Sequence, residues 1–507
     1  MSIARTQRPP SQTSGSRPVL PSRLAMPMEP LRRSLVHRLT LILVWFAVAS
    51  SAFVFTEPAP TDVLTLIVIV LLPVVGLAAF PPEMLVLASI WMTICAMGAL
   101  AALIANDIAT ATTHMAITLY LALAATVYGA FVARNPVRHG KLLLNAHLAA
   151  ALIAAAAGLA GYFDLPSGTG ELFTKFDRAS GPFKDPNVFG PFLVPALVYA
   201  LHLLLSGPPL KSAAASLAFA FLSLALLVSF SRGAWAAAAG AIAIFLYLRF
   251  VTTRRNLDRI RILVLGFAGL VAVFAVLATA LQFDAVDKLF SERATLTQTY
   301  DTGSEGRFGG QWKAFGLIVE RPFGIGSLEF PKRYHHEDVH NVYLSMFLNA
   351  GWLGGLSFLL LMVASVLLGA RHALRRTRTQ GLFLVAFASF AAMVALGALI
   401  DTDHWRHLYL LFGLTWGLML ADRKTIRTSR IVADRRPILL RSVIVLPPPR
   451  RHGRIVPPNA NIICLETHRR RGRQPGELNR PRRLVGPVRP KRPARLLRPA
   501  PPYAIGN

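Results

Sequence analysis

The sequence has little charge and very few acidic residues for its length. Only 16% of its 507 residues are charged, whereas 54% are hydrophobic. Soluble globular proteins carry about 25% charged residues, so this composition excludes an ordinary soluble fold. Lys and Arg number 54 against 25 Asp and Glu, which means that the shortage of charge is mainly a shortage of acid.

Cysteine is almost absent. Cys95 lies within an apolar run and Cys464 lies in a basic, proline-rich tail. We expect these two residues not to meet, so no disulfide framework is predicted.

What the sequence holds in abundance is apolar runs of about 20 residues, the length that crosses a bilayer as a helix. The predicted fold class is therefore an all-α polytopic membrane protein. We predict twelve transmembrane spans, at residues 38–56, 62–80, 84–104, 111–133, 142–162, 188–206, 212–230, 233–250, 262–283, 341–370, 380–400 and 407–421. Only two residues separate 212–230 from 233–250, so one long kinked helix is an alternative there.

Basic residues beside the spans predict the orientation. They crowd in the N-terminal arm and beside alternate loops, at residues 134–141, 211, 249–261 and 371–378. Because the basic side of such proteins is usually cytoplasmic, both termini are predicted to lie in the cytoplasm. The loops at residues 163–187 and 284–340 would then lie on the opposite face, the second one between spans nine and ten.

Both ends of the chain are predicted to be disordered and cytoplasmic: a basic arm at residues 1–37 and an Arg- and Pro-rich tail at 422–507, with the twelve-span domain at 38–421 between them. The tail holds 22 Lys and Arg against 4 Asp and Glu, and its composition cannot bury a core. We expect it to be attracted to anionic lipid of the inner leaflet. Nucleic-acid binding is not expected, because no aromatic residues are interleaved with the charge.

Two arginines are predicted to stand at helix starts on the far face. Arg232 stands at the beginning of the span at 233–250. Arg307 lies in the first turn of a loop helix predicted from about Ser304 to Val319, whose start supplies an N-cap candidate and an acid, Glu305. A helix N-terminus with a guanidinium favours phosphate binding, and two such arginines suit a diphosphate. The alternative is that Arg232 is an interfacial anchor and Arg307 a solvated loop residue.

His340 directly precedes the tenth span. A neutral histidine there is suited to taking a proton from a hydroxyl group. His335 and His336 lie close by in the sequence, so a metal site is a second interpretation, although the ligand spacing is poor. A third is that His340 only caps the helix.

Other polar residues on the far face are candidates for substrate contact. Lys184 and Asn187 lie in a segment made rigid by prolines, and Asn341 follows His340. Asp401 belongs to a polar group between the last two spans, which is equally consistent with an ordinary loop; its other members are Asp403, His404, Arg406 and His407. Asp107 and His114 have no partner that the sequence identifies.

The far-face motifs resemble the O-antigen ligase and polymerase family over about residues 180–360. The motifs are Phe183-Lys184-Asp185-Pro186-Asn187, Ser231-Arg232-Gly233, Gly306-Arg307 with Trp312, Pro322-Phe323-Gly324-Ile325-Gly326 and His340-Asn341-Val342-Tyr343-Leu344. Their order on a twelve-span scaffold carries the resemblance, whereas the N-terminal third is similar only in hydropathy and the tail matches nothing in the family.

The resemblance implies an inverting glycosyltransferase of the bacterial inner membrane that acts at the periplasmic face without metal, cofactor or nucleotide sugar. Its donor would be a glycan on undecaprenyl diphosphate, and its acceptor lipid A–core or another glycan. Arg232 and Arg307 would hold the diphosphate, and His340 would deprotonate or orient the acceptor hydroxyl.

Three alternatives stay open from the sequence. A polymerase of repeat units would use the same donor site as a ligase. A polysaccharide-related transporter would also fit twelve spans, but it would be expected to bury charges near mid-membrane, and these spans are nearly free of them. The basic tail alone would suit a scaffold of an envelope complex.

Overall fold

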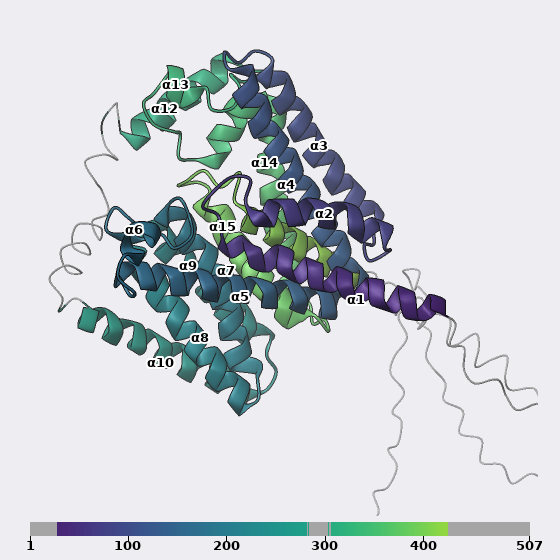
Figure 1. Ribbon diagram of the computed structural model, residues 1–507, viewed down its shortest axis with the longest axis vertical. Coiled ribbons are helices and arrows are strands. Elements are labelled where there is room, and N and C mark those ends of the chain that lie inside the picture. The colour runs from purple at the N-terminus through teal and green to yellow at the C-terminus, as the bar shows by residue number, and fades with distance from the viewer. Residues whose placement is uncertain (1–27, 281, 283–302, 304–305, 424–507) are drawn as a thin grey trace, which may run out of the picture. The chain divides into compact units, whose positions relative to one another are not determined.

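The computed structural model describes residues 28–280, 282, 303 and 306–423. These residues are almost entirely helical (Figure 1). In the first half, the elements are α1 (Met28–Ala49), η1 (Ser50–Ala52), α2 (Pro60–Val74), α3 (Pro82–Ala102), α4 (Ile108–Arg134), α5 (Pro136–Tyr162), α6 (Thr169–Phe173), β1 (Thr174–Lys175), β2 (Arg178–Ala179) and α7 (Pro186–Ser206). The second half has α8 (Pro209–Leu227), α9 (Arg232–Thr252), α10 (Asn256–Ala280), α12 (Arg307–Glu320), α13 (Phe330–Arg333), α14 (Val342–Ala373), α15 (Gln380–Leu396) and a further helix at 406–423.

The fold is that of a multi-pass membrane protein. Eight helices in the described residues are long and apolar enough to cross a membrane; they are the helix at 34–52, α3, α4, α5, α7, α8, α9 and α14. α2 and α15 are shorter apolar helices of 15 and 17 residues. A helix lies at each of the twelve predicted positions, while the number that cross and their orientation stay predictions.

Prolines and capping side chains explain where the helices begin. Proline stands in the first turn of α2, α3, α5, α7 and α8, where its missing N–H costs nothing. Polar side chains cap the starts of four helices: Asp107 caps α4, Asp185 caps α7, Ser231 caps α9 and Asn341 caps α14. α7 therefore has both a proline in its first turn and a capping side chain. These caps fix the ends of the helices from which the candidate site is built.

The structure excludes one alternative interpretation and moves one predicted boundary. α8 and α9 are separate helices with a tight turn between them, so the single kinked helix is excluded. α1 begins at Met28, within the range predicted as a disordered arm. Residues 1–27 and 424–507, which include nearly all of both predicted tails, lie outside the described residues.

The two loops that are predicted to lie on the far face are more structured than the sequence indicated. The loop at 163–187 folds into α6 and a two-stranded antiparallel hairpin, β1–β2, in which Thr174 pairs with Ala179. In the second loop, α12 begins at Arg307 with Gly306 as its N-cap and without a side-chain cap, so the predicted acidic first turn is wrong. Ser304 and Glu305 lie outside the described residues.

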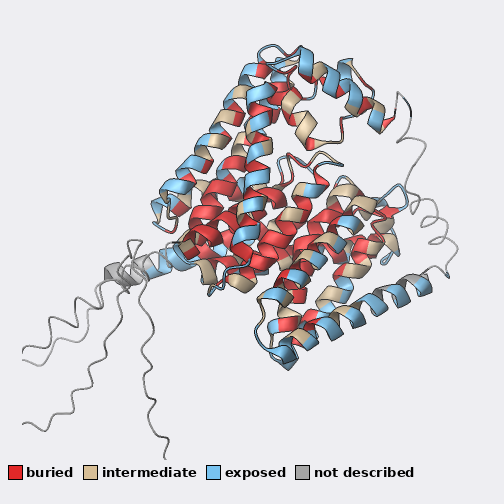
Figure 2. Ribbon diagram, turned by 180° about the vertical axis from the view of Figure 1, so that it is seen from behind, coloured by how far each residue is buried: buried red, intermediate tan, exposed pale blue. Residues whose placement is uncertain are grey.

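The buried core runs through the centre of the helix bundle (Figure 2). Many large apolar side chains of the helices are exposed. α7 is the most enclosed of the candidate spans and packs against α5, α8, α9 and α15. α14 packs against α3, α12 and α15. Exposed leucines such as Leu210, Leu217 and Leu360 suit contact with lipid, as expected for a membrane bundle.

Candidate functional site

His340 lies in a strained turn directly before α14. Its φ of 52° is in the left-handed region, which non-glycine residues seldom adopt. Asp401 holds this backbone, because its Oδ2 accepts a hydrogen bond from the His340 N–H at 2.9 Å. The imidazole is about one-third exposed, and its Nδ1 lies 4.0 Å from the same carboxylate oxygen. The turn therefore presents a partly accessible ring beside a half-buried acid.

The residues after His340 anchor this turn to the end of α15. Asn341 caps α14, its Oδ1 accepting the N–H groups of Tyr343 and Leu344 at 3.1 and 3.3 Å. The Val342 N–H donates to the Gly397 carbonyl at 2.8 Å. Since Asn341 is the N-cap, the interpretation of His340 as a helix cap is wrong, and Asn341 itself has a structural role.

The pKa values of His340 and Asp401 are shifted in opposite directions. Burial lowers the pKa of His340, and the Arg307 charge lowers it further, against the nearby acids Asp338, Glu337 and Asp185. Burial raises the pKa of Asp401 to about 7, and Asp403 adds to this shift. The Ser345 hydroxyl, which donates to Asp401 Oδ1 at 2.5 Å, opposes it. At neutral pH the imidazole is therefore uncharged and able to accept a proton.

Arg307 belongs to the same site as His340. It is the first residue of α12, and its charge acts on His340. α12 is tied to the segment before His340, because Gln311 Nε2 donates to the Val339 carbonyl at 3.5 Å. Arg307 and His340 thus lie close enough for their charges to interact, and their roles stay predictions.

Arg232 begins α9 on the other side of α15. Its neighbour Gly233 lies so close to Leu396 that a Cβ there would be 2.9 Å from the leucine Cδ1. Leu396 directly precedes Gly397, whose carbonyl binds Val342. The starts of α9 and α14 therefore flank the same end of α15, which brings Arg232 toward the His340 turn.

A buried arginine that the sequence did not single out supports this region. Arg178 donates from Nε to the Ser229 carbonyl and from Nη2 to Asn187 Oδ1, both at 2.9 Å. Ser229 lies in the turn that leads to Arg232, and Asn187 lies in the first turn of α7. Arg178 thus joins the β1–β2 hairpin to two helix starts. In the sequence it is one more arginine in a polar loop, and no local signal marks it as buried.

Comparison with known proteins bears on the same residues. Residues 217–359 match the O-antigen ligase family model. That segment of the chain is similar to O-antigen ligases. The matched segment holds Arg232, Arg307 and His340, which confirms the family resemblance read from their motifs. No curated protein matches the chain.

The remaining predicted residues lie outside the matched O-antigen ligase segment, apart from Asn341. Asn187 is held by Arg178, and Asp401 contacts His340 directly. Lys184 is different, because its ammonium pairs with Glu57 at 3.1 Å and is about half exposed. The structure thus joins Asp401 to the site and gives Lys184 another partner.

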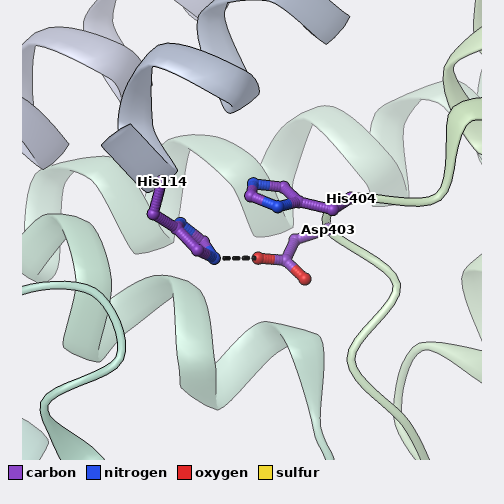
Figure 3. Close-up of side chains that lie close together, drawn as sticks. All are labelled: His114, Asp403 and His404. Atoms are coloured by element: carbon purple, nitrogen blue, oxygen red, sulfur yellow. Dashed lines mark ion pairs between the residues drawn. The ribbon is translucent and has the colours of Figure 1, made fainter. Parts of the chain in front are cut away.

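His114, Asp403 and His404 form a largely buried polar cluster next to the candidate site (Figure 3). His114 Nε2 lies 3.3 Å from Asp403 Oδ2, and the two histidine rings stack with centroids 4.0 Å apart. Burial would raise the pKa of Asp403, but His404 and the hydrogen bond from His114 hold it at about 2. His114, which had no partner identified from the sequence, thus stabilises a buried carboxylate.

This cluster is also where a metal ion would fit best among the described residues. One potential ligand atom from each of its three side chains lies within 4.8 Å of the others. His404 Nε2, however, is hydrogen-bonded to Thr118 Oγ1 at 3.1 Å, and His114 Nε2 already pairs with Asp403. Because these side chains bond to one another and to Thr118, the arrangement fits a hydrogen-bonded cluster better than a formed metal centre.

The histidines at 335–340 form no such group within the described residues. His335 is buried against Gly310 of α12, and its Nδ1 accepts the Glu337 N–H at 3.2 Å. Its ring stacks on that of His336 instead of converging with it on His340. The packing favours a structural role for His335 and leaves His340 to the site.

Proposed function

We propose that the protein transfers a glycan from a polyprenyl diphosphate lipid to an acceptor hydroxyl at the periplasmic face of the inner membrane. The observation that carries the proposal is that α12, which begins at Arg307, is bonded to the segment before the partly accessible His340, so that the Arg307 charge acts on His340. Both residues lie in the segment that matches the O-antigen ligase family. Undecaprenyl diphosphate is the proposed donor lipid and lipid A–core the proposed acceptor. Repeat-unit polymerisation, with another glycan as acceptor, is the second candidate.

Each step of the reaction has a residue suited to it. The acceptor oxygen attacks the anomeric carbon and gives its proton to His340. The bond from that carbon to the diphosphate oxygen breaks with inversion, and the leaving diphosphate keeps the electron pair. Arg232 and Arg307, each at a helix N-terminus, hold the negative charge that develops there. No metal ion enters this scheme.

Asp401 has a supporting role in the proposal. It accepts the His340 N–H and thereby maintains the left-handed turn that aims the ring. In its ionised form Asp401, whose Oδ2 lies 4.0 Å from Nδ1, also favours the imidazolium that forms when His340 takes the acceptor proton. Asn187 acts indirectly, through the Arg178 bonds that fix the start of α9.

Glycan analysis of a deletion strain tests the proposal and separates its two forms. A ligase predicts that long chains disappear from lipid A–core while lipid-linked polymer accumulates. A polymerase predicts single repeats on lipid A–core. Normal glycans in the deletion strain, together with solute uptake by vesicles that contain the purified protein, would reject both in favour of a transporter.

A further inference from the structure

α12 carries an exposed stripe of large apolar side chains. Phe308, Trp312, Phe315 and Val319 are 51%, 76%, 52% and 59% exposed. At about 100° per residue, these four positions fall within an arc of about 60° on the helix. Three aromatic side chains and a valine are unfavourable in water. A large exposed apolar patch of this kind therefore marks a contact surface.

The other two faces of α12 have different characters. Gly310, Ala314 and Ile318 are buried and form the face that packs into the protein. Lys313 and Glu320 are exposed and lie on a third face, between the apolar stripe and the buried one. A helix with one packed, one apolar and one charged face suits the boundary between an apolar phase and water.

The stripe is continuous with the outer face of a predicted span. The Trp352 Nε1 donates to the Ile318 carbonyl at 2.6 Å, and the Trp352 N–H donates to the Pro322 carbonyl at 2.8 Å. Trp352 is 49% exposed, and the exposed residues Leu353, Leu356 and Leu360 follow it along α14. The C-terminal end of α12 thus rests where the apolar outer face of α14 begins.

We propose that the apolar stripe of α12, defined by Phe308, Trp312, Phe315 and Val319, is a lipid-binding surface that lies in the membrane interface. The occupant is the lipid of the leaflet that surrounds α14, since both apolar surfaces meet at Trp352. Aromatic side chains are enriched at this depth of a bilayer, and the charged face would remain in water.

This placement has a consequence for donor binding. Arg307 is the first residue of α12, so a helix held in the interface keeps that guanidinium at the depth of lipid phosphate groups. This consequence rests on the proposed function. The lipid contact itself does not, because it concerns only the surface of α12.

Spin labelling of the full-length protein in nanodiscs tests the lipid contact. Cys95 and Cys464 are replaced by Ala, and single cysteines are introduced as Phe315→Cys and Val319→Cys. Lys313→Cys and Glu320→Cys are matched controls on the same two turns of the helix. The collision rates of each attached nitroxide with oxygen, which concentrates in lipid, and with a water-soluble nickel chelate are then measured.

We expect labels at 315 and 319 to collide more with oxygen and less with nickel than labels at 313 and 320. Equal, water-like accessibility at all four positions would overturn the proposal. So would protection of 315 and 319 from both reagents, because it would indicate a protein partner or a second copy of the chain. Glycan transfer is not measured, so a failure of the proposed function would leave this result unaffected.

Discussion

At the scale of single residues, the two arginines of the proposed diphosphate site should be required and should not be replaceable by lysine. We expect Arg232→Ala and Arg307→Ala each to cost about 2–4 kcal/mol of transition-state stabilisation, roughly 30- to 1,000-fold in transfer rate. Lysine should restore only part of the rate, because a point charge cannot reproduce the bidentate fork. The rates are measured with purified protein, a lipid-linked donor and an acceptor.

Arg321→Ala is the matched control for Arg307→Ala. Arg307 is the first residue of α12, whereas Arg321 is an exposed arginine at the C-cap of the same helix. Arg321→Ala should keep the wild-type rate. Near wild-type transfer by both the Arg232 and Arg307 alanine variants would remove these residues from the mechanism.

The pH dependence of the transfer rate should reveal the effect of the Arg307 charge on the pKa of His340. The base must be neutral, so the rate should be full at high pH and should fall as pH drops through the pKa of His340. That pKa is lowered from the ordinary 6.5, so activity should persist to a more acidic pH than a free imidazole would allow. Arg307→Ala removes one cause of the lowering and should move the acid limb of the profile to higher pH.

The residual activity of Arg307→Ala is measured across pH beside Arg321→Ala. An acid limb that does not move when Arg307 is replaced would show that His340 is not the titrating base or that the two charges do not interact.

At the scale of elements, the break in α14 depends on glycine. Gly351 has φ 64° and ψ −172°, a conformation that is essentially confined to glycine, and a Cβ there would lie 2.6 Å from the Pro322 carbonyl oxygen. Gly324 packs against the same break, and the Ile325 N–H donates to the Leu348 carbonyl at 2.8 Å. The motif at 322–326 thus fastens the far-side loop to α14.

We therefore expect Gly351→Ala to destabilise the protein by about 1–3 kcal/mol and to lower transfer, because the loop carries Arg307. Gly240→Ala is the control, since Gly240 lies in α9 with open space around its Cα and alanine favours a helix there. Thermal unfolding in detergent compares them. Equal stability of the two variants would contradict the role assigned to the break.

The helices could be predicted from the sequence, whereas the strands could not. Apolar runs of bilayer length predicted the positions of the helices, because that signal is local to each run. The proposed site residues were recognisable because each stands at a polar interruption between such runs. The hairpin β1–β2 was not recognised, since strands of two residues leave no periodic pattern.

Contacts between residues far apart in the chain could not be predicted from the sequence. Lys332 bonds Asp107 at 2.8 Å although the two are 225 positions apart, and the Asp107 N–H donates to Glu329. The support of His340 by Asp401 and the burial of Arg178 likewise depend on how the helices pack. A single sequence without an alignment carries no signal for such pairs.

At the scale of the whole molecule, the basic tail should be dispensable for catalysis. The proposed site draws on residues 178–403, so removal of residues 424–507 should leave transfer by the reconstituted protein unchanged. The same truncation should weaken binding to anionic vesicles, which the tail is expected to contact. Complete loss of transfer by a normally inserted truncation would indicate a scaffold role instead of an autonomous enzyme.

The most direct test of the account is a reconstituted transfer reaction with His340→Ala beside the wild-type chain. The protein in lipid is given a polyprenyl-diphosphate-linked glycan and a lipid A–core acceptor, with and without a chelator, and the product is followed by mass spectrometry. We expect the wild type to transfer the glycan at a rate that the chelator does not change. We expect His340→Ala to bind the lipid-linked donor but not to transfer the glycan. Wild-type rates in His340→Ala, or activity that the chelator removes and a divalent metal restores, would contradict it.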